Sequence, residues 1–441
     1  MRQFSIAVIA LALCSLATAE EPEDPYLWLE EIQGEEALTW VEERSATDTA
    51  TLEAVPVFPE IHEKLLEIYN SSDRIPRVAR RGSWLYNYWR DAEHVRGIWR
   101  RTFLDEYVKE EPSWETVLDL DVLAEAEGEN WVWKGSTCLQ PEYRHCLISL
   151  SRGGGDATVT REFDTVAKAF AEKGFFLPEA KAQVDWKDKD TLWVGTDFGE
   201  GSLTTSGYPR IAKEWKRGTP LDEAVTVFEG SVDDVAAVVF SIHTTEGRYD
   251  VAQVTPEFYR GTTFLILDGR KVKLDIPEDA SIVGVFKDRM MLTLRTDWKI
   301  AGTSYPADAL LAIDVDDFLA GGRDFDVLFT PSERISLGGV GTTANHVLVS
   351  TLDNVRGRLY RMTPGDEGWT TEEIELPGLG TVGIGSTSDF DDSFFFTYTD
   401  FLTPSSLYYI ADGAEPKQVK SSPSWFDPEG MTVEQYEAPS A

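Results

Sequence analysis

The sequence predicts an all-β chain, a seven-bladed β-propeller preceded by a short helical segment at the N-terminus. Three observations favour this fold. Short strand-like runs recur from about residue 77 onward, each bounded by Gly, Asp, Asn or Pro. The span 74–434 divides into seven units of about 52 residues, near the length of known propeller blades. The chain contains 14 Trp, and aromatic side chains recur in the strand-like runs, which suits the packing of blade upon blade.

The strand-like runs have the length of single strands. A small antiparallel sheet cannot bury both of its faces alone, so neighbouring blades must stack. The same rhythm also fits a pair of β-sandwiches or a β-helix, and the strand pattern alone leaves these alternatives open. The clearest runs are 84–89, 97–103, 116–120, 131–137, 146–150, 191–195, 235–242, 263–267, 290–295, 346–351 and 393–399.

Two helices are predicted ahead of the strands, within residues 20–73. The run 35–52 places Leu38, Val41 and Leu52 at roughly helical spacing. Pro59 opens a second helix, because proline is well tolerated in the first turn. Polar residues 70–73 end that helix. The propeller is therefore expected to occupy 74–434.

Residues 1–19 have the pattern of a secretory signal peptide. Arg2 is the only charge, an apolar run covers 4–16, and 17–19 is a small-x-small cleavage site. The apolar run is too short to span a bilayer. We therefore expect an exported chain, secreted or periplasmic, with no membrane partner.

The charge balance excludes some partners. Asp and Glu number 77 against 41 Lys and Arg, which gives a net charge of −36 at pH 7. Nucleic-acid and anionic-membrane surfaces need clustered cations, so neither is an expected partner. Hydrophobic residues make up 42% of the chain, which excludes a disordered acidic polymer.

Cys138 and Cys146 flank a turn between two predicted strands. Two strands meeting at that turn can bring the cysteines opposite each other, and an oxidising compartment would then favour a disulfide. Free thiols remain an alternative. A metal site with His145 is another, although three ligands from one hairpin make a poor zinc set. We predict no metal site and no cofactor.

The chain shows no catalytic motif of its own. The nucleophile elbow of α/β-hydrolases needs Gly-x-Ser-x-Gly, which is absent here. No two of the five His are spaced as i, i+4, and the many adjacent acids are typical of solvated turns. The glycine-rich run 338–341 lacks the Lys of a phosphate-binding loop and is predicted to be a turn. No residue is therefore predicted to be catalytic.

The run 195–210 is the most unusual segment. It is a long Gly, Ser and Thr loop that follows a predicted strand. Loops of this kind often carry binding residues, although a plain inter-strand connection is the simpler alternative. Its candidate ligand contacts are Asp197, Tyr208 and Arg210.

Several segments resemble the prolyl oligopeptidase family of serine peptidases. The N-terminal ones are Asp24-Pro25-Tyr26-Leu27-Trp28-Leu29-Glu30-Glu31 and Trp40-Val41-Glu42-Glu43-Arg44. Further segments similar to a bacterial branch of the family are 151–157, 161–164, 175–181, 195–199 and 215–220. The resemblance covers essentially the whole chain after the signal.

The resemblance implies a seven-bladed propeller that caps an α/β-hydrolase domain and restricts access to short peptides. The family's Ser, Asp and His lie in that hydrolase domain. Residues 435–441 resemble the crossing into it, so the triad would lie beyond this chain. The resemblance also places Trp193 roughly where a propeller aromatic reaches the substrate pocket.

The expected function is therefore the substrate-gating part of a serine peptidase on short peptides, inactive without a separate or missing hydrolase domain. One alternative is a non-catalytic propeller that binds peptides or glycans. Another is a carboxylate-based glycosidase, which only the abundance of acids favours. Without the hydrolase domain, Trp28, Leu29, Trp40 and Val41 are expected to form an uncovered, sticky patch.

Overall fold

The computed structural model describes residues 24–31 and 34–438, in two compact units that divide between Asn70 and Ser71. The predicted signal peptide, residues 1–19, lies outside the described residues, as does the end of the predicted crossing at 439–441. Within the described ranges, none of the helices is both long enough and apolar enough to cross a membrane.

The N-terminal unit is helical, as predicted. It contains the 3-10 turn η1 (Leu27–Glu30) and the helices α1 (Glu35–Glu53) and α2 (Phe58–Asn70). The Trp28 and Trp40 rings meet edge to face, with centroids 6.2 Å apart. Trp40 and Val41 remain exposed, whereas Trp28 and Leu29 are half-buried.

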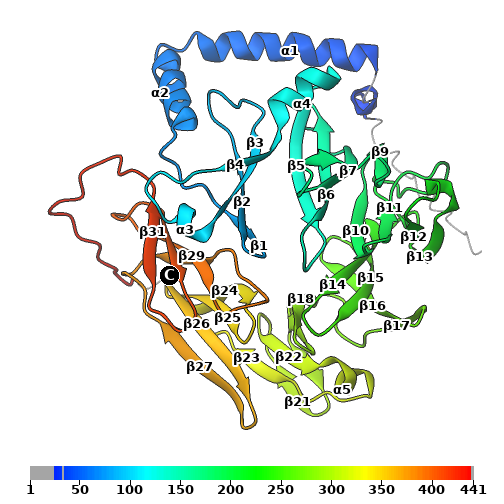
Figure 1. Cartoon of the computed structure of the whole chain (residues 1–441), viewed down its shortest axis with the longest axis vertical. Helices are drawn as coiled ribbons and strands as arrows, with labels where there is room; N and C mark the ends of the chain where they lie inside the picture. The colour runs from blue at the N-terminus through cyan, green and yellow to red at the C-terminus, as the bar shows by residue number, and fades with distance from the viewer. Residues whose placement is uncertain (1–23, 32–33, 439–441) are drawn as a thin grey trace, which may run out of the picture. The chain divides into compact units, whose positions relative to one another are not determined.

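The second unit is a ring of seven antiparallel sheets, and the first strand of each sheet lies toward the middle of the ring (Figure 1). Blade 1 contains β1 (Ala79–Arg81), β2 (Trp84–Trp89), β3 (Ile98–Phe103) and β4 (Glu115–Asp119). Blade 2 contains β5 (Trp131–Cys138), β6 (His145–Arg152), β7 (Thr158–Asp164), β8 (Ala169–Phe170) and β9 (Phe176–Ala180). Blade 3 contains β10 (Gln183–Asp188), β11 (Thr191–Gly195), β12 (Ile211–Lys216) and β13 (Val225–Glu229).

The remaining four blades follow the same pattern. Blade 4 contains β14 (Ala236–His243), β15 (Arg248–Glu257), β16 (Arg260–Leu267) and β17 (Arg270–Lys273). Blade 5 contains β18 (Ser281–Phe286), β19 (Arg289–Thr293), β22 (Leu310–Asp314) and β23 (Asp326–Phe329), with the hairpin β20 (Trp298–Ile300) and β21 (Thr303–Tyr305) inserted. Blade 6 contains β24 (Ile335–Thr342), β25 (Val347–Asp353), β26 (Arg356–Gly365) and β27 (Gly368–Ile374). Blade 7 contains β28 (Thr381–Ile384), β29 (Phe394–Thr399), β30 (Ser406–Ile410) and β31 (Lys417–Ser421).

Stacked blades explain why whole strands are apolar. Every residue of β11 is buried. Leu192 and Val194 pack in a core with Leu147 of blade 2, and Trp193 packs in another core with Val239 of blade 4. A strand covered on both faces needs no polar alternation. The seven-bladed propeller predicted from the sequence is confirmed, and the sandwich and β-helix alternatives are excluded.

Short helices in the blade connections were missed by the sequence analysis. They are α3 (Leu104–Tyr107), α4 (Leu120–Glu127), η2 (Leu221–Glu223) and α5 (Val315–Leu319). Asp119 caps α4, since its carboxylate accepts from the Asp121 and Val122 amides. Such short helices carry too little periodicity to be recognised in sequence.

The turn predicted at 338–341 is wrong, because these residues belong to β24. A register shift lies between Leu337 and Gly339, where β24 pairs with β25. A Cβ on Gly338 would lie 3.1 Å from the Ser350 hydroxyl. Glycine here lets a bulged inner strand approach its neighbour.

Cys138 and Cys146 form a disulfide, with Cα atoms 4.0 Å apart. The two residues are directly opposite each other at the end of the β5–β6 hairpin. The predicted pairing is thus present.

Blades 7 and 1 meet without a shared strand, since each described sheet uses strands from one stretch of sequence. Arg80 of β1 pairs with Asp391, with 2.5 Å between Nη2 and Oδ2. An apolar cluster supports this contact; it includes Leu85, Tyr107, Phe395 and Leu407.

Candidate functional site

The strand order defines two faces of the ring. Consecutive strands of a blade are antiparallel, so the start of the first strand and the end of the fourth lie at the same face. This face, here the connection face, carries the blade-to-blade links, the loops between second and third strands, and both ends of the propeller. On it, Gln435 bonds Asn354 O at 2.7 Å, and Glu437 pairs with Arg334. The opposite face carries the other turns.

The loop 196–210 joins β11 to β12 and therefore lies on the connection face. Asp197 organises its first half, because its Oδ1 accepts from the Gly199 amide at 2.8 Å and the Ser202 hydroxyl at 3.2 Å. Ser202 also donates to Gly199 O at 2.6 Å. The predicted ligand contact Asp197 is exposed, and its carboxylate is already engaged in shaping the loop.

The second half of the loop is held by Arg210. Its guanidinium donates to Gly201 O at 2.7 Å, Gly230 O at 2.9 Å and Glu229 Oε1 at 2.6 Å. Tyr208 is half-buried, and the Lys181 ammonium lies over its ring at 4.6 Å. Arg210 thus fixes the loop to β13. Of the three predicted ligand contacts in this loop, Tyr208 is the one whose side chain makes the fewest hydrogen bonds within the fold.

Trp193 is 1% exposed and does not contribute to a surface. Its indole nitrogen donates to the Ser241 hydroxyl at 2.9 Å, and Ser241 in turn donates to Asp250 at 2.7 Å. The prediction that Trp193 touches substrate is replaced by a packing role between blades 3 and 4. The reason is that blade 4 covers the face of β11 on which Trp193 lies.

Exposed aromatic side chains concentrate on the connection face. Phe258 and Tyr259 form the β15–β16 turn and are 80% and 63% exposed. Arg295 stacks on Tyr259 at 4.3 Å. Other aromatic residues exposed on or beyond the connection-face loops are Phe401, Trp425, Phe426 and Tyr436. Exposed apolar groups in this number mark a contact surface.

A polar pocket of about 320 Å³ opens on this face where blades 5 and 6 meet. Asp279, Asp308 and Arg295 supply its charged groups. Asp279 also accepts from the Thr296 hydroxyl at 2.8 Å. The volume falls in the range of small-ligand sites. Sequence reasoning missed this pocket, because its residues come from three separate connections.

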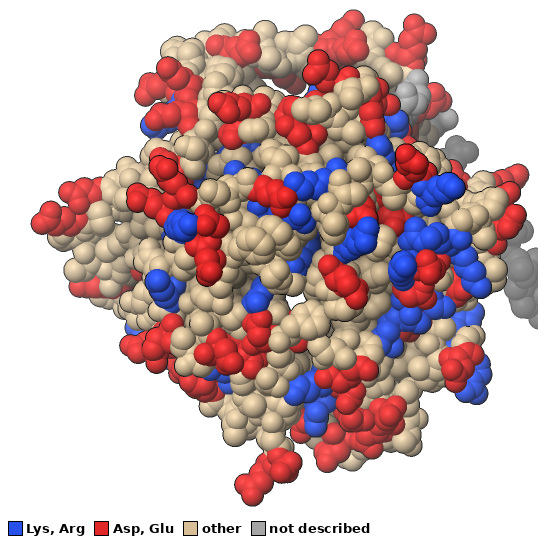
Figure 2. All heavy atoms as spheres, in the orientation of Figure 1, with Lys and Arg blue, Asp and Glu red and all other residues tan. Residues whose placement is uncertain are grey.

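Figure 2 shows acidic side chains over much of the visible face, with Lys and Arg gathered over blade 3. Two lysines of this region contact aromatic rings. Lys181 lies over Tyr208, and Lys213 lies over Phe198 at 4.0 Å. Neither lysine forms a salt bridge with a described residue, as is true of most lysines in this part of the chain.

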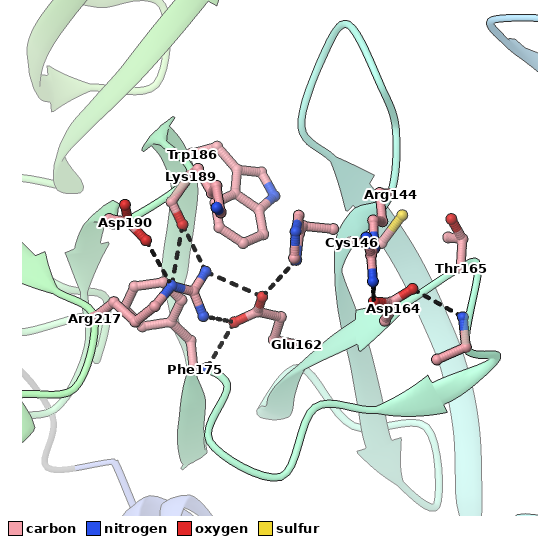
Figure 3. A network of polar contacts seen from close by, with 12 residues as sticks. Arg144, Cys146, Glu162, Asp164, Thr165, Phe175, Trp186, Lys189, Asp190 and Arg217 are labelled. Atoms are coloured by element: carbon pink, nitrogen blue, oxygen red, sulfur yellow. Dashed lines mark hydrogen bonds and ion pairs between the residues drawn. The ribbon is translucent and has the colours of Figure 1, made fainter.

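An ionic cluster around one buried carboxylate joins blades 2 and 3 (Figure 3). The Glu162 side chain is 1% exposed and contacts His145 Nδ1 at 2.9 Å and Arg217 Nη1 at 2.7 Å. The Phe175 amide also donates to Glu162, and Arg217 reaches Asp190 at 3.1 Å. Because every polar atom of the carboxylate is engaged within the fold, the cluster is a structural junction.

One histidine contacts a hydroxyl group. His346 Nδ1 lies 2.8 Å from Thr363 Oγ1, and its Nε2 lies 3.7 Å from Asp392. Burial lowers the pKa of His346 more than Asp392 raises it. Asp392 also accepts from Asn345 and Thr343, so the array ties blade 6 to blade 7. Across the described ranges, no serine hydroxyl is hydrogen-bonded to a His ring, and no group of three His, Cys, Asp or Glu is placed to hold a metal ion.

Comparison with known proteins decides the family. Residues 17–421 match the model of the prolyl oligopeptidase N-terminal β-propeller domain. The chain belongs to the prolyl oligopeptidase family. Two similar proteins are an uncharacterized peptidase of Sinorhizobium fredii, which is 36% identical over 96% of this chain, and one of Rickettsia prowazekii, which is 30% identical over 94% of it. This chain spans 60% of the length of each.

Solved structures agree with the family assignment. A post-proline cleaving enzyme from Rickettsia typhi superposes with a TM-score of 0.87 at 28% identity, over 93% of this chain and 62% of that enzyme. Oligopeptidase B from Leishmania major shares the fold, with a TM-score of 0.69 at 13% identity, over 93% of this chain and 58% of that protein. The prolyl oligopeptidase resemblance drawn from sequence segments is thus confirmed, and the chain corresponds to the propeller portion of these peptidases.

Proposed function

We propose that this chain is the substrate-restricting propeller of an exported serine peptidase that cleaves short peptides. The connection face roofs the reaction chamber, and a catalytic α/β-hydrolase domain outside these 441 residues supplies the Ser, His and Asp. The chain by itself is inactive. Export rests on the signal pattern of residues 1–19.

One observation carries this proposal. The chain matches the propeller domain of a peptidase family over 17–421, yet spans only 60% of the related peptidases. The exposed aromatics of the connection face support the proposal further. Exposed rings such as Phe258, Tyr259 and Phe401 lower the solubility of an isolated propeller, so they are better explained by contact with another domain. We assign this aromatic surface to contact with the catalytic domain.

Peptide contact is assigned to the loop 196–210. Tyr208 offers a ring face, and Lys181 beside it offers a cation with no internal ion pair. A peptide carboxylate would gain a charge-assisted contact there. Asp197 and Arg210 act as positioning residues, since their hydrogen bonds shape the loop that presents Tyr208.

The test is a chimera that joins this chain to the remaining 40% or so of the Sinorhizobium fredii peptidase, about one further domain of length. We expect turnover of short proline-containing chromogenic peptides and none of a folded protein. Tyr208→Ala should raise KM for the short peptide and leave kcat unchanged, because binding alone is lost. Phe176→Ala in the same chimera, at an exposed aromatic of β9 outside both the loop and the aromatic surface, should leave KM unchanged.

Three outcomes would contradict the proposal. The first is turnover by the chain alone. The second is a folded chimera that degrades folded proteins as fast as short peptides. The third is tight binding of a glycan or peptide by the chain, together with a folded chimera that hydrolyses no peptide. That result would favour a non-catalytic binding propeller.

A further inference from the structure

A cavity of about 910 Å³ lies at the junction of blades 7 and 1, where the ring closes. Its walls include the segment 72–76 that leads into β1, parts of the β3–β4 connection 108–114, and residues 419–421 at the end of β31. Figure 1 shows α3 and β31 side by side here, and the Lys420 ammonium bonds Glu110 O at 3.3 Å across the junction. The volume is that of a small-ligand site.

Arg100 of β3 is held rigidly in the wall of this cavity. Its Cζ lies 4.6 Å from the ring centre of Trp89 and 4.3 Å from that of Trp114. Its Nε donates to Asn87 Oδ1 at 2.9 Å, and the buried Asn87 amide donates in turn to Arg77 O at 2.8 Å. Two indole rings and one buried amide thus fix the plane of the guanidinium.

The two terminal nitrogens of Arg100 have no acceptor within the described ranges, and neither nitrogen is closed off from solvent. Arg101, the next residue of β3, differs. Its Nε donates to Glu115 at 2.6 Å, and its Nη1 donates to the Tyr86 hydroxyl at 3.0 Å and to Thr165 O of blade 2 at 3.1 Å. Because neighbouring side chains of a strand point to opposite faces, Arg101 meets blade 2 and Arg100 meets the cavity. A guanidinium that is held in place with its donors open can receive a ligand.

Two further cations line the same cavity, Arg74 and Lys420. The Arg74 Cζ lies 4.7 Å from the Trp89 ring centre, and its Nε donates to Ser71 O at 3.0 Å. The Lys420 ammonium donates to two backbone carbonyls of the β3–β4 connection. Both side chains are therefore placed by neutral backbone oxygens, and neither forms an ion pair with any residue that the structure describes.

Acids complete the charged lining of the cavity. They are Asp73, Asp91, Glu110 and Glu111. Asp91 already accepts from the Trp89 indole nitrogen at 2.9 Å, whereas the other three acids are exposed. These acids would repel a compact polyanion such as phosphate. A ligand with one carboxylate and one ammonium matches both kinds of charge.

We propose that this cavity is a second peptide-binding site, in which Arg100 receives the C-terminal carboxylate of a free short peptide and the exposed acids receive its ammonium. The two terminal nitrogens of a guanidinium match the two oxygens of a carboxylate. Ile75, Pro76 and Val419 add apolar wall for the peptide's side chains. The choice of a peptide rests on the proposed function, but the binding itself needs only the propeller.

Burial shows why a carboxylate would be favourable here. Burial lowers the pKa of Arg100 to about 10, although Asp91 acts to raise it. Burial likewise lowers the pKa of Lys420, against the opposite effect of Glu110. A partly enclosed cation without a paired acid is costly, and a bound carboxylate offsets part of that cost. Since the cavity lies between blades 7 and 1, an occupied site should also tighten the ring-closing junction.

Isothermal titration calorimetry of the chain with the dipeptide Ala-Pro tests the site. Arg100→Gln should weaken binding about tenfold, the loss expected for a hydrogen bond to a charged group. N-acetyl-Ala-Pro-amide, which lacks both charges, should bind the wild type as weakly. Arg289→Gln, at a half-buried arginine of β19 that lies outside the cavity, is the matched control and should keep the affinity. A circular dichroism spectrum that matches the wild type checks that each variant folds.

Hydrogen exchange by mass spectrometry locates the bound peptide. Ala-Pro should slow exchange of residues 71–76 and 417–421 in the wild type and not in Arg100→Gln.

Three results would overturn the second site. They are no binding of Ala-Pro at millimolar concentration, equal affinity of the free and the capped peptide, and unchanged affinity in Arg100→Gln. Tighter binding of inorganic phosphate than of Ala-Pro would also overturn the peptide assignment. Tyr208→Ala separates this site from the loop 196–210, because loss of binding in that variant alone would leave only the loop as a peptide site. Conversely, Ala-Pro bound through Arg100 in a chain whose chimera shows no turnover would contradict the proposed function alone.

Discussion

The junction between blades 2 and 3 and the junction between blades 7 and 1 meet the same packing need differently. At the first, Glu162 is 1% exposed and binds His145 and Arg217 together. At the second, Arg80 and Asp391 pair with side chains 20% and 37% exposed. Blades 2 and 3 are joined by two residues of chain, whereas blades 7 and 1 are joined by none. The covalently linked junction encloses its central carboxylate almost completely, whereas the ring-closing junction leaves the Asp391 carboxylate partly exposed. The two arginine side chains are about equally accessible, at 24% for Arg217 and 20% for Arg80.

This difference predicts where the ring is weakest. A buried charge that loses its partner is strongly destabilising, whereas a partly exposed pair is screened by water. Breaking the ion cluster of blades 2 and 3 should therefore cost more than breaking the pair of blades 7 and 1. The predictions below run from the largest expected effect to the smallest.

Glu162→Ala should lower the free energy of unfolding most, by about 3–5 kcal/mol, because it leaves the Phe175 amide without its acceptor and Arg217 with only Asp190 and the Lys189 carbonyl. Urea denaturation followed by tryptophan fluorescence measures it. Glu373→Ala is the matched control, since its pair with Arg358 has the same 2.7 Å distance but is exposed, and should cost under about 1 kcal/mol. Equal losses in the two variants would contradict the comparison.

Removing the disulfide by Cys138→Ser with Cys146→Ser should lower the free energy of unfolding by about 2–3 kcal/mol, because the open loop regains entropy in the unfolded chain. The same urea titration measures this, and dithiothreitol added to the wild type should reproduce it. If dithiothreitol also lowered the free energy of unfolding of the double variant, the effect of the reductant would not come from this disulfide.

Arg80→Ala should cost about 1–2 kcal/mol, less than Glu162→Ala, because water already screens the Asp391 pair. Hydrogen exchange in β1 and in residues 385–393 should rise together. Arg334→Ala removes a pair that is 60% exposed on both sides and should leave stability nearly unchanged. A loss at Arg80 as large as that at Glu162 would mean that ring closure is no weaker than the other junction.

The smallest effect concerns two acids of one loop with opposite pKa shifts. Burial acts to raise the pKa of Asp391, but hydrogen bonds from Ser393 and from the Arg80 guanidinium hold this pKa below its usual value of 3.8. Asp391 therefore adds stability above pH 3.8 that is lost as the pH falls through its lowered pKa. Burial raises the Asp389 pKa, so its contribution is full below pH 3.8 and is lost as the pH rises through the raised value.

Thermal unfolding between pH 3 and pH 7 separates these two acids. Asp391→Asn should flatten the loss of stability at the acid end. Asp389→Asn should remove the loss on rising pH, so this variant gains on the wild type toward neutral pH. If both variants changed the pH profile in the same direction, the assigned pKa shifts would be wrong.

Much of the fold follows from local sequence. The runs 84–89 and 191–195 were predicted with the bounds that β2 and β11 have, because Gly or Asp lies at or close to each end of these strands. The Cys138–Cys146 disulfide was predictable because both residues lie in one hairpin. The resemblance of short segments added the blade number and the family, which periodicity alone left open.

The site was less predictable, for physical reasons. Trp193 reads as a possible contact until blade 4 covers it. Glu162 and Arg217 are 55 residues apart in sequence, so no local pattern predicts their contact. Loop 196–210 was recognised by composition, but only the hydrogen bonds of Asp197 and Arg210 distinguish its framework from Tyr208.

The central claim is that this chain is a propeller whose chemistry is supplied by another domain. The most direct measurement incubates the purified chain with a serine-reactive phosphonate and a short proline-containing chromogenic peptide, then reads intact mass and absorbance. We predict no mass shift and no turnover. A stoichiometric adduct on one serine, with peptide cleavage that the adduct abolishes, would contradict the account.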